Sequence, residues 1–151
     1  MKDKNSFKLY NVLFPVWMFV LFPYFWFIVF PANFIIDSLV LIISMYALKM
    51  CAKRQFYKKH ILWIFSFGML SDIVGALYML LTLMLFENYN IDVDDPRLTV
   101  PALLISAALI FVLNYFVTFR KDEKALRYKM SLIFAIATAP YTFFIPIEWM
   151  Y

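Results

Sequence analysis

Apolar residues in this chain fall into five blocks separated by short polar segments. Each block is about 20 residues long, the length of helix that crosses a hydrocarbon core of about 30 Å at 1.5 Å per residue. The pattern predicts an all-α integral membrane protein with five transmembrane helices in a single polytopic domain, residues 1–151. The predicted spans are residues 12–30, 31–50, 61–86, 100–119 and 130–147.

The first block is also the place where a secretory signal peptide would lie. Its apolar stretch is too long for such a signal, and no small-x-small cleavage motif follows it. We therefore expect an uncleaved first span, in which Pro15 and Pro23 favour kinks. Pro31 is expected at the first position of the second span, where its missing N–H costs nothing. The two spans would then form a tight antiparallel hairpin.

Lys and Arg residues are distributed unevenly between the predicted loops. All but one of the 14 lie in the N-terminal segment or in the loops after the second and fourth blocks. The exception is Arg97, whose loop also carries Glu87, Asp92, Asp94 and Asp95. Because basic loops stay on the cytoplasmic side, the N-terminus is expected inside and the C-terminus outside, in the plasma membrane.

Composition agrees with this class and limits the partners. The chain is 65% apolar and 16% charged, against about 45–50% and about 25% in soluble domains. The net charge of +4 belongs to loops next to apolar blocks, so we expect anchoring and attraction to anionic lipid headgroups, and no binding of nucleic acid. His60 is expected to be a further interfacial anchor. The single cysteine, Cys51, excludes an internal disulfide and is expected to be an inert thiol.

Asp72 is the only ionisable residue of the apolar block 61–86. An aspartate in mid-membrane costs about 3 kcal/mol on insertion scales. Gly68 and Gly75, the only glycines in the chain, share its helix face at spacings of four and three and would let another helix come close. Asp72 is thus either a proton or cation site or a neutral carboxyl that fixes helix packing.

Asp37 is the second intramembrane acid. It shares a helix face with Asn33 and Ser44, which predicts a polar stripe facing a shared polar interior with Asp72. The alternative is that Asn33 and Asp37 only stabilise the start of a helix, where the dipole favours negative groups. Asn114, in the inner half of the fourth block, is a weaker candidate whose amide would form packing contacts between helices.

No pattern of metal or cofactor binding stands out. The loop from Asn88 to Asp95 has oxygen-bearing side chains at alternate positions, but it lacks the glycine and the terminal glutamate of a calcium-binding EF-hand. The chain also lacks a CxxC pair, a glycine-rich phosphate loop and a nucleophile elbow. We expect no metal site and no cofactor.

Three functions fit these features. The favoured one is a transporter or channel-like protein that handles a proton, cation or small polar solute through Asp37 and Asp72, aided by oligomerisation. The second is a non-catalytic accessory, immunity or assembly subunit whose acids pair with a partner membrane protein, since the chain is expected to have no Lys or Arg within the membrane to pair with Asp72. The third, an enzyme with a carboxylate dyad, needs two adjacent carboxyls, whereas the expected depths are about 9 Å for Asp37 and about 15–20 Å for Asp72.

Overall fold

The computed structural model describes residues 24, 26–85 and 95–144 of the chain, and all its regular elements are helical. In chain order they are α2 (Trp26–Ala47), α3 (Lys53–Leu85), α4 (Pro96–Leu113), the π-helix η4 (Asn114–Thr118), α5 (Lys124–Ala137) and the 3-10 helix η5 (Tyr141–Phe144). Residues 12–23 and 25 of the predicted first span lie outside the described residues, as does the loop 86–94.

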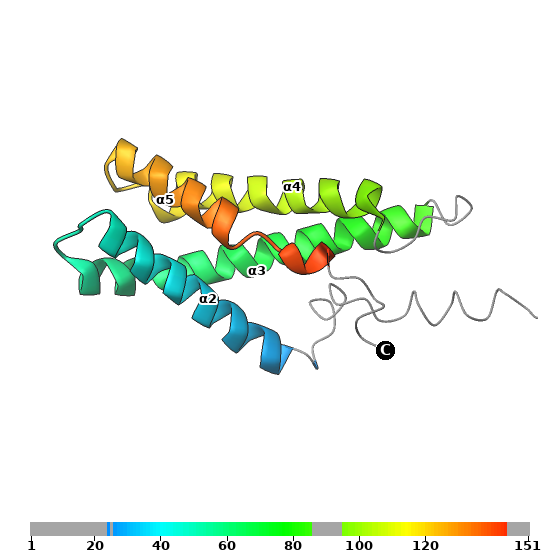
Figure 1. Cartoon of the computed structure of the whole chain (residues 1–151), viewed down its shortest axis with the longest axis horizontal. Coiled ribbons are helices and arrows are strands. Elements are labelled where there is room, and N and C mark those ends of the chain that lie inside the picture. The colour runs from blue at the N-terminus through cyan, green and yellow to red at the C-terminus, as the bar shows by residue number, and fades with distance from the viewer. Residues whose placement is uncertain (1–23, 25, 86–94, 145–151) are drawn as a thin grey trace, which may run out of the picture.

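The described helices form an elongated bundle. Helices α3 and α4 lie side by side along its length, and α2 and α5 pack against them (Figure 1). Three helical segments are long and apolar enough to cross a membrane: α2, α3, and α4 together with η4. The described part of the chain is therefore that of a membrane protein, with large apolar side chains exposed on its flanks, including Ile43 and Leu62.

Helix α2 starts earlier than expected. It begins at Trp26, so residues 26–30 belong to this helix and not to the preceding span. Pro31 lies inside the helix rather than at its first position. A proline inside a helix loses one hydrogen bond and its ring crowds the carbonyl four residues before it, but its φ angle fits a helix, and α2 continues through Pro31. This shift of five residues changes the depth of every polar residue in α2.

Helix α3 has 33 residues and is about 50 Å long at the helical rise, well beyond the thickness of a bilayer core. It begins at Lys53, eight residues before the apolar block that starts at Ile61. The added residues are mostly Lys, Arg and Gln, which are good helix formers. The basic segment is thus a helical extension of the span, and only residues 48–52 form the connection to α2.

Helix α4 begins with a capped turn and ends with a widened one. The side chain of Asp95 accepts a hydrogen bond of 2.7 Å from the backbone N–H of Arg97, and Pro96 takes the first helical position. At the other end, the N–H of Phe119 donates to the carbonyl of Asn114 at 3.0 Å, so this bond joins residues five apart in the sequence and not four apart as in an α-helix. Such π-helical turns hold one extra residue.

Helix α5 differs most from the predicted fifth span. It starts at Lys124, six residues before the predicted block, and ends at Ala137. Pro140 follows closely; it has no N–H to donate to Ile136 and its ring crowds that carbonyl, which disfavours a continuing helix, and the chain turns and forms η5. The 14 residues of α5 measure about 21 Å, too short to cross a bilayer core as one helix. Residues 145–147 lie outside the described part.

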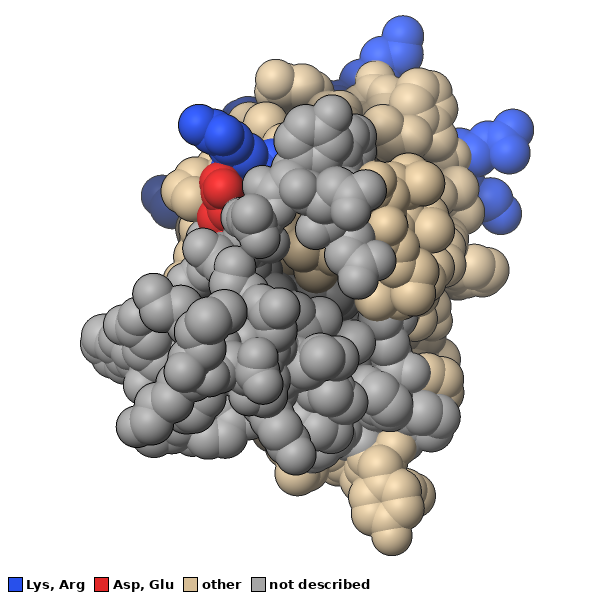
Figure 2. Space-filling view, turned by 90° about the vertical axis from the view of Figure 1, so that its right-hand side faces the viewer, with Lys and Arg blue, Asp and Glu red and all other residues tan. Residues whose placement is uncertain are grey.

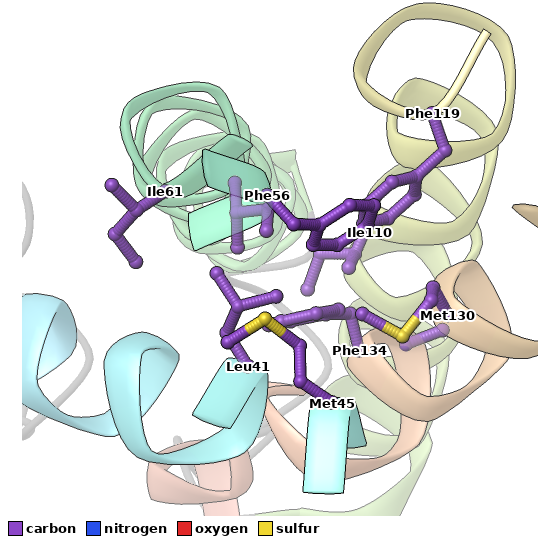
Figure 3. Close-up of a cluster of buried hydrophobic side chains, with 10 residues drawn as sticks. Leu41, Met45, Phe56, Ile61, Ile110, Phe119, Met130 and Phe134 are labelled. Carbon is purple, nitrogen blue, oxygen red and sulfur yellow. The ribbon is translucent and has the colours of Figure 1, made fainter. Parts of the chain in front are cut away.

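Two apolar clusters hold the bundle together. The larger draws on α2, α3, α4 and α5 near the ends of the two basic loops, and its side chains converge in Figure 3. The smaller joins α3 and α4 to η5 through Met79, Leu98 and Phe143. Buried and partly buried polar groups interrupt this apolar packing, and they include the candidates for function.

The two described basic loops lie at the same end of the bundle (Figure 1). Asp122, in the loop between η4 and α5, lies 3.4 Å from Nζ of Lys59 and 3.0 Å from Nε2 of His60, near the start of α3. Figure 2 views the molecule from the end where α3 finishes, and it shows Lys and Arg around the edge of the described surface. The two loops therefore share one end of the bundle, which is compatible with the predicted placement of both on one side of a membrane.

Candidate functional site

Four of the residues singled out from the sequence meet between α2 and α3. Asn33 and Asp37 lie one turn apart on α2, and Gly68 and Asp72 lie one turn apart on α3. Nδ2 of Asn33 donates to Oδ2 of Asp72 at 3.3 Å. Oδ2 of Asp37 lies over Gly68, 3.4 Å from the position that a Cβ would take there. We call Asp37 and Asp72 the acid pair, and the candidate site consists of the acid pair and Asn33.

The neighbours of the acid pair provide little polar compensation. Asp37 is 4% exposed and has no recorded hydrogen bond within the described part of the chain. Oδ1 of Asp72 is buried and lacks a hydrogen-bond partner among the described residues. The amide of Asn33 also contacts Sδ of Met69 at 3.1 Å, so it serves both Met69 and Asp72. The carboxyls of the site therefore have fewer hydrogen bonds from described residues than they can accept.

Like charge makes this arrangement costly if both acids are ionised. Asp37 and Asp72 face the same contact between α2 and α3, Asp37 over Gly68 and Asp72 on Asn33, and like charges on neighbouring carboxyls repel. No recorded ion pair among the described residues reaches either carboxyl, since the ion pairs found there belong to Asp122. Two carboxylates in an apolar setting are stabilised by a proton or a cation between or beside them. A proton or cation there would offset the repulsion between the two carboxylates.

The structure corrects the expected difference in depth between the acids. From Trp26, Asp37 lies about 16 Å along α2, and Asp72 lies about 20 Å from the end of α3 at Leu85. The smaller value expected for Asp37 came from placing the helix start at Pro31. Measured from Trp26 and Leu85, the acids lie at similar distances along their helices. The difference in depth expected from the sequence therefore no longer argues against a dyad in which Asp37 and Asp72 share a proton.

The other sequence candidates lie apart from the acid pair. Ser44 donates to the carbonyl of Val40 at 2.6 Å and is a buried packing residue of α2. Asn114 begins η4, is 1% exposed, and its Oδ1 lacks a hydrogen-bond partner among the described residues. Gly75 packs against Ser106 and Phe143, so it faces α4 and η5, whereas Gly68 faces α2. The two glycines thus serve different neighbours.

His60 is a second polar centre, and sequence reasoning took it only for an interfacial anchor. The ring is 1% exposed, and the ring centroids of Phe56 and Phe119 lie 4.1 and 5.1 Å from its own. Its Nδ1 lies 2.9 Å from the carbonyl of Phe56, which can only accept, so Nδ1 carries a proton. A signal was available in the sequence: Asp122 is one of two acids in an otherwise basic loop.

The contact between His60 and Asp122 depends on a further proton. Nε2 of His60 lies 3.0 Å from Oδ2 of Asp122, but the two do not meet the geometry of a well-aligned hydrogen bond. With Nδ1 already protonated, this contact is attractive only if a second proton lies on Nε2 or on the carboxyl. The pair ties α3 to the loop before α5.

No group of three or more His, Cys, Asp or Glu side chains comes together to hold a metal among the described residues. Cys51 is exposed in the turn between α2 and α3. Comparison of the chain with known family models, with curated proteins and with solved structures finds no match.

Proposed function

We propose that this protein is a small membrane transporter or channel-like protein that moves a proton, a cation or a small polar solute carrying positive charge. The acid pair would be its binding site, with Asn33 as the group that orients Asp72. The observation that supports this proposal is the meeting of Asp37 and Asp72 between two membrane-length helices, with no basic side chain recorded on either carboxyl in the described chain.

The chemistry of the site favours positive charge as cargo. A buried carboxylate without a partner has a large desolvation cost, and a second carboxylate nearby adds repulsion. Binding a proton or cation relieves both costs, and releasing it restores them, so the site can load and unload. An anionic solute would add to the repulsion and is disfavoured.

The acid pair also lies where an ion path needs a site. Asp37 and Asp72 are each more than ten residues from the helix ends at Trp26 and Leu85. Asn33 and Asp72 are only partly buried within the described bundle, so the site is not sealed by described residues. A second copy of the chain would enclose the same surface more fully, as expected for a thin bundle.

Flux through proteoliposomes tests the proposal. Wild-type protein, Asp37→Asn and Asp72→Asn are reconstituted, and proton, sodium and potassium fluxes are followed under imposed gradients. Each substitution keeps the side-chain volume but removes a charge needed for loading, so we expect flux to fall at least about tenfold, the effect of roughly 1.4 kcal/mol at the site. The matched control is Glu123→Gln, which removes an exposed acid at the basic end. Wild-type flux in both aspartate variants would overturn the proposal.

One observation also favours the accessory-subunit alternative. Oδ1 of Asp72 is buried and unpaired among the described residues, and a Lys, Arg or polar group on a partner helix would satisfy it. In that case the protein would act by assembly and would show no flux. Mild solubilisation followed by mass measurement separates the two: a chain that purifies alone as a monomer counts against the accessory role.

A further inference from the structure

A groove opens at the corner where α2 ends and α3 begins. Its volume is about 280 Å³. Its lining comes from the last turns of α2 and the first turns of α3: Ile42, Met45, Tyr46, Lys53, Arg54 and Tyr57. It is distinct from the acid pair, which lies further along both helices, and nothing in its lining takes part in the candidate site.

The wall of this groove is apolar and held in place. Met45 is almost fully buried and belongs to the larger apolar cluster, while Ile42 is 39% exposed at the open side. The hydroxyl of Tyr57 pairs with Oγ of Ser38 at 2.9 Å, which fixes the ring across the two helices. The groove therefore offers a formed apolar surface, and Leu39 and Ile43 on the same helix are also exposed.

The rim of the groove carries positive charge that the described bundle leaves unneutralised. Nζ of Lys53 lies 3.5 Å from the ring centroid of Tyr46, so a cation–π contact holds both side chains at the rim. Arg54 is exposed and makes no recorded ion pair with a described residue. The sequence has no Asp or Glu from residue 38 to residue 71, so this hairpin cannot neutralise its own rim.

We propose that the groove binds one anionic phospholipid, with its phosphate on Arg54 and Lys53 and the upper part of an acyl chain along Ile42. A guanidinium matches a phosphate in charge and geometry, and lysine adds a second positive group. The volume is just below the usual range for ligand pockets, and the groove is open, so only part of the lipid lies in it and the rest stays in the bilayer.

The position of the groove and its apolar wall together select a lipid over a soluble anion. The rim residues precede the apolar block that starts at Ile61, so they lie where a helix leaves the hydrocarbon, at the level of headgroups. Tyr46 and Tyr57 suit the same interface, where aromatic residues with a polar tip are enriched. A free phosphate would contact the rim but would leave the apolar wall unused.

Native mass spectrometry of the full chain, released from detergent with added lipid, tests the inference. Phosphatidylglycerol and phosphatidylcholine of equal chain length are titrated onto wild-type protein and onto a Lys53→Gln, Arg54→Gln double variant. We expect wild type to retain phosphatidylglycerol in preference to phosphatidylcholine. The double variant should bind phosphatidylglycerol roughly 10- to 30-fold more weakly, as two headgroup-facing cations contribute.

Three comparisons separate this site from general charge attraction. The Arg120→Gln, Lys121→Gln variant removes the same charge from two exposed positions of the other basic loop and should keep wild-type binding. Ile42→Trp fills the groove without a charge change and should weaken binding if its thermal stability is unaltered. Inorganic phosphate at constant ionic strength should not displace the lipid. Equal losses in the two double variants, equal binding of phosphatidylcholine, or full displacement by phosphate would each overturn the proposal.

Discussion

Gly68 and Gly75 show how a missing side chain can serve two different purposes on one helix. At Gly68 the space is filled by Oδ2 of Asp37, at ordinary contact distance from an added Cβ. At Gly75 an added Cβ would overlap Oγ of Ser106 and would come within 2.8 and 2.9 Å of the Phe143 ring. A side chain at position 75 would clash with Ser106 and Phe143, whereas a small side chain at position 68 would fit beside the carboxyl of Asp37.

This contrast predicts opposite costs for the same substitution. Gly75→Ala should destabilise the protein by about 1–3 kcal/mol, because the buried ring and hydroxyl must move. Gly68→Ala should change stability by no more than about 1 kcal/mol, since alanine favours a helix and meets only a carboxylate oxygen. Thermal unfolding in detergent, followed by circular dichroism, measures both. Equal losses of stability in the two variants would contradict the packing described here.

At the level of single residues, the sequence predicts much of the acid pair. The four-residue spacings of Asn33 with Asp37 and of Gly68 with Asp72 place each pair on one helix face, and the structure brings these faces together. Spacing does not say at which level two helices meet. Ser44 shares the stripe of Asp37 but lies two turns away and bonds to its own helix. Contacts between helices therefore had to come from the structure.

At the level of elements, helix α3 connects the acid pair to the basic end of the bundle. Its first turns carry Lys59 and His60, and both contact Asp122 in the loop before α5. The apolar blocks of the sequence predicted the three membrane-length helices α2, α3 and α4 with η4, but the predicted ends of these helices differ from the observed ends by up to eight residues. The ends were missed because charged residues continue a helix beyond the apolar block and because Pro31 does not start one.

The link through Asp122 leads to a prediction about this loop. Asp122→Asn removes the charge that faces Lys59 and His60, so the loop should open more often. Losing a charged contact of about 1 kcal/mol corresponds to roughly fivefold faster amide exchange at residues 119–123. Hydrogen–deuterium exchange in detergent measures this change. Glu123→Gln is the matched control, because Glu123 is exposed and makes no recorded ion pair with a described residue. Equal exchange in both variants would argue against a tether.

At the level of the whole molecule, the bundle has one basic end and a membrane-length body. The turn that carries Cys51 and the loop that carries Asp122 lie together at this end, and α4 starts at the other end with Arg97 exposed (Figure 1). The sequence predicts five spans, and the described residues show three membrane-length helices and a shorter α5. The break at Pro140 was not apparent from hydropathy, because the apolar residues continue past it.

Sidedness of the bundle gives a prediction for labelling in cells. A thiol reagent that cannot cross membranes should react with Cys51 in inside-out vesicles but not in intact cells, since the basic end is expected in the cytoplasm. In a Cys51→Ser background, Arg97→Cys should show the reverse pattern. Labelling of both positions from the same side would contradict the arrangement of α3 and α4 as antiparallel crossing helices.

The widened turn of η4 has a geometric consequence for the chain as a whole. One extra residue in a helix rotates everything after it by about 100°. Phe119 follows this turn, is fully buried, and stacks on Phe56 with ring centroids 5.9 Å apart. Without the extra residue the ring would face another direction, and the following loop would turn with it. The π-helical turn Asn114–Thr118 therefore sets the direction in which Phe119 packs against Phe56 of α3.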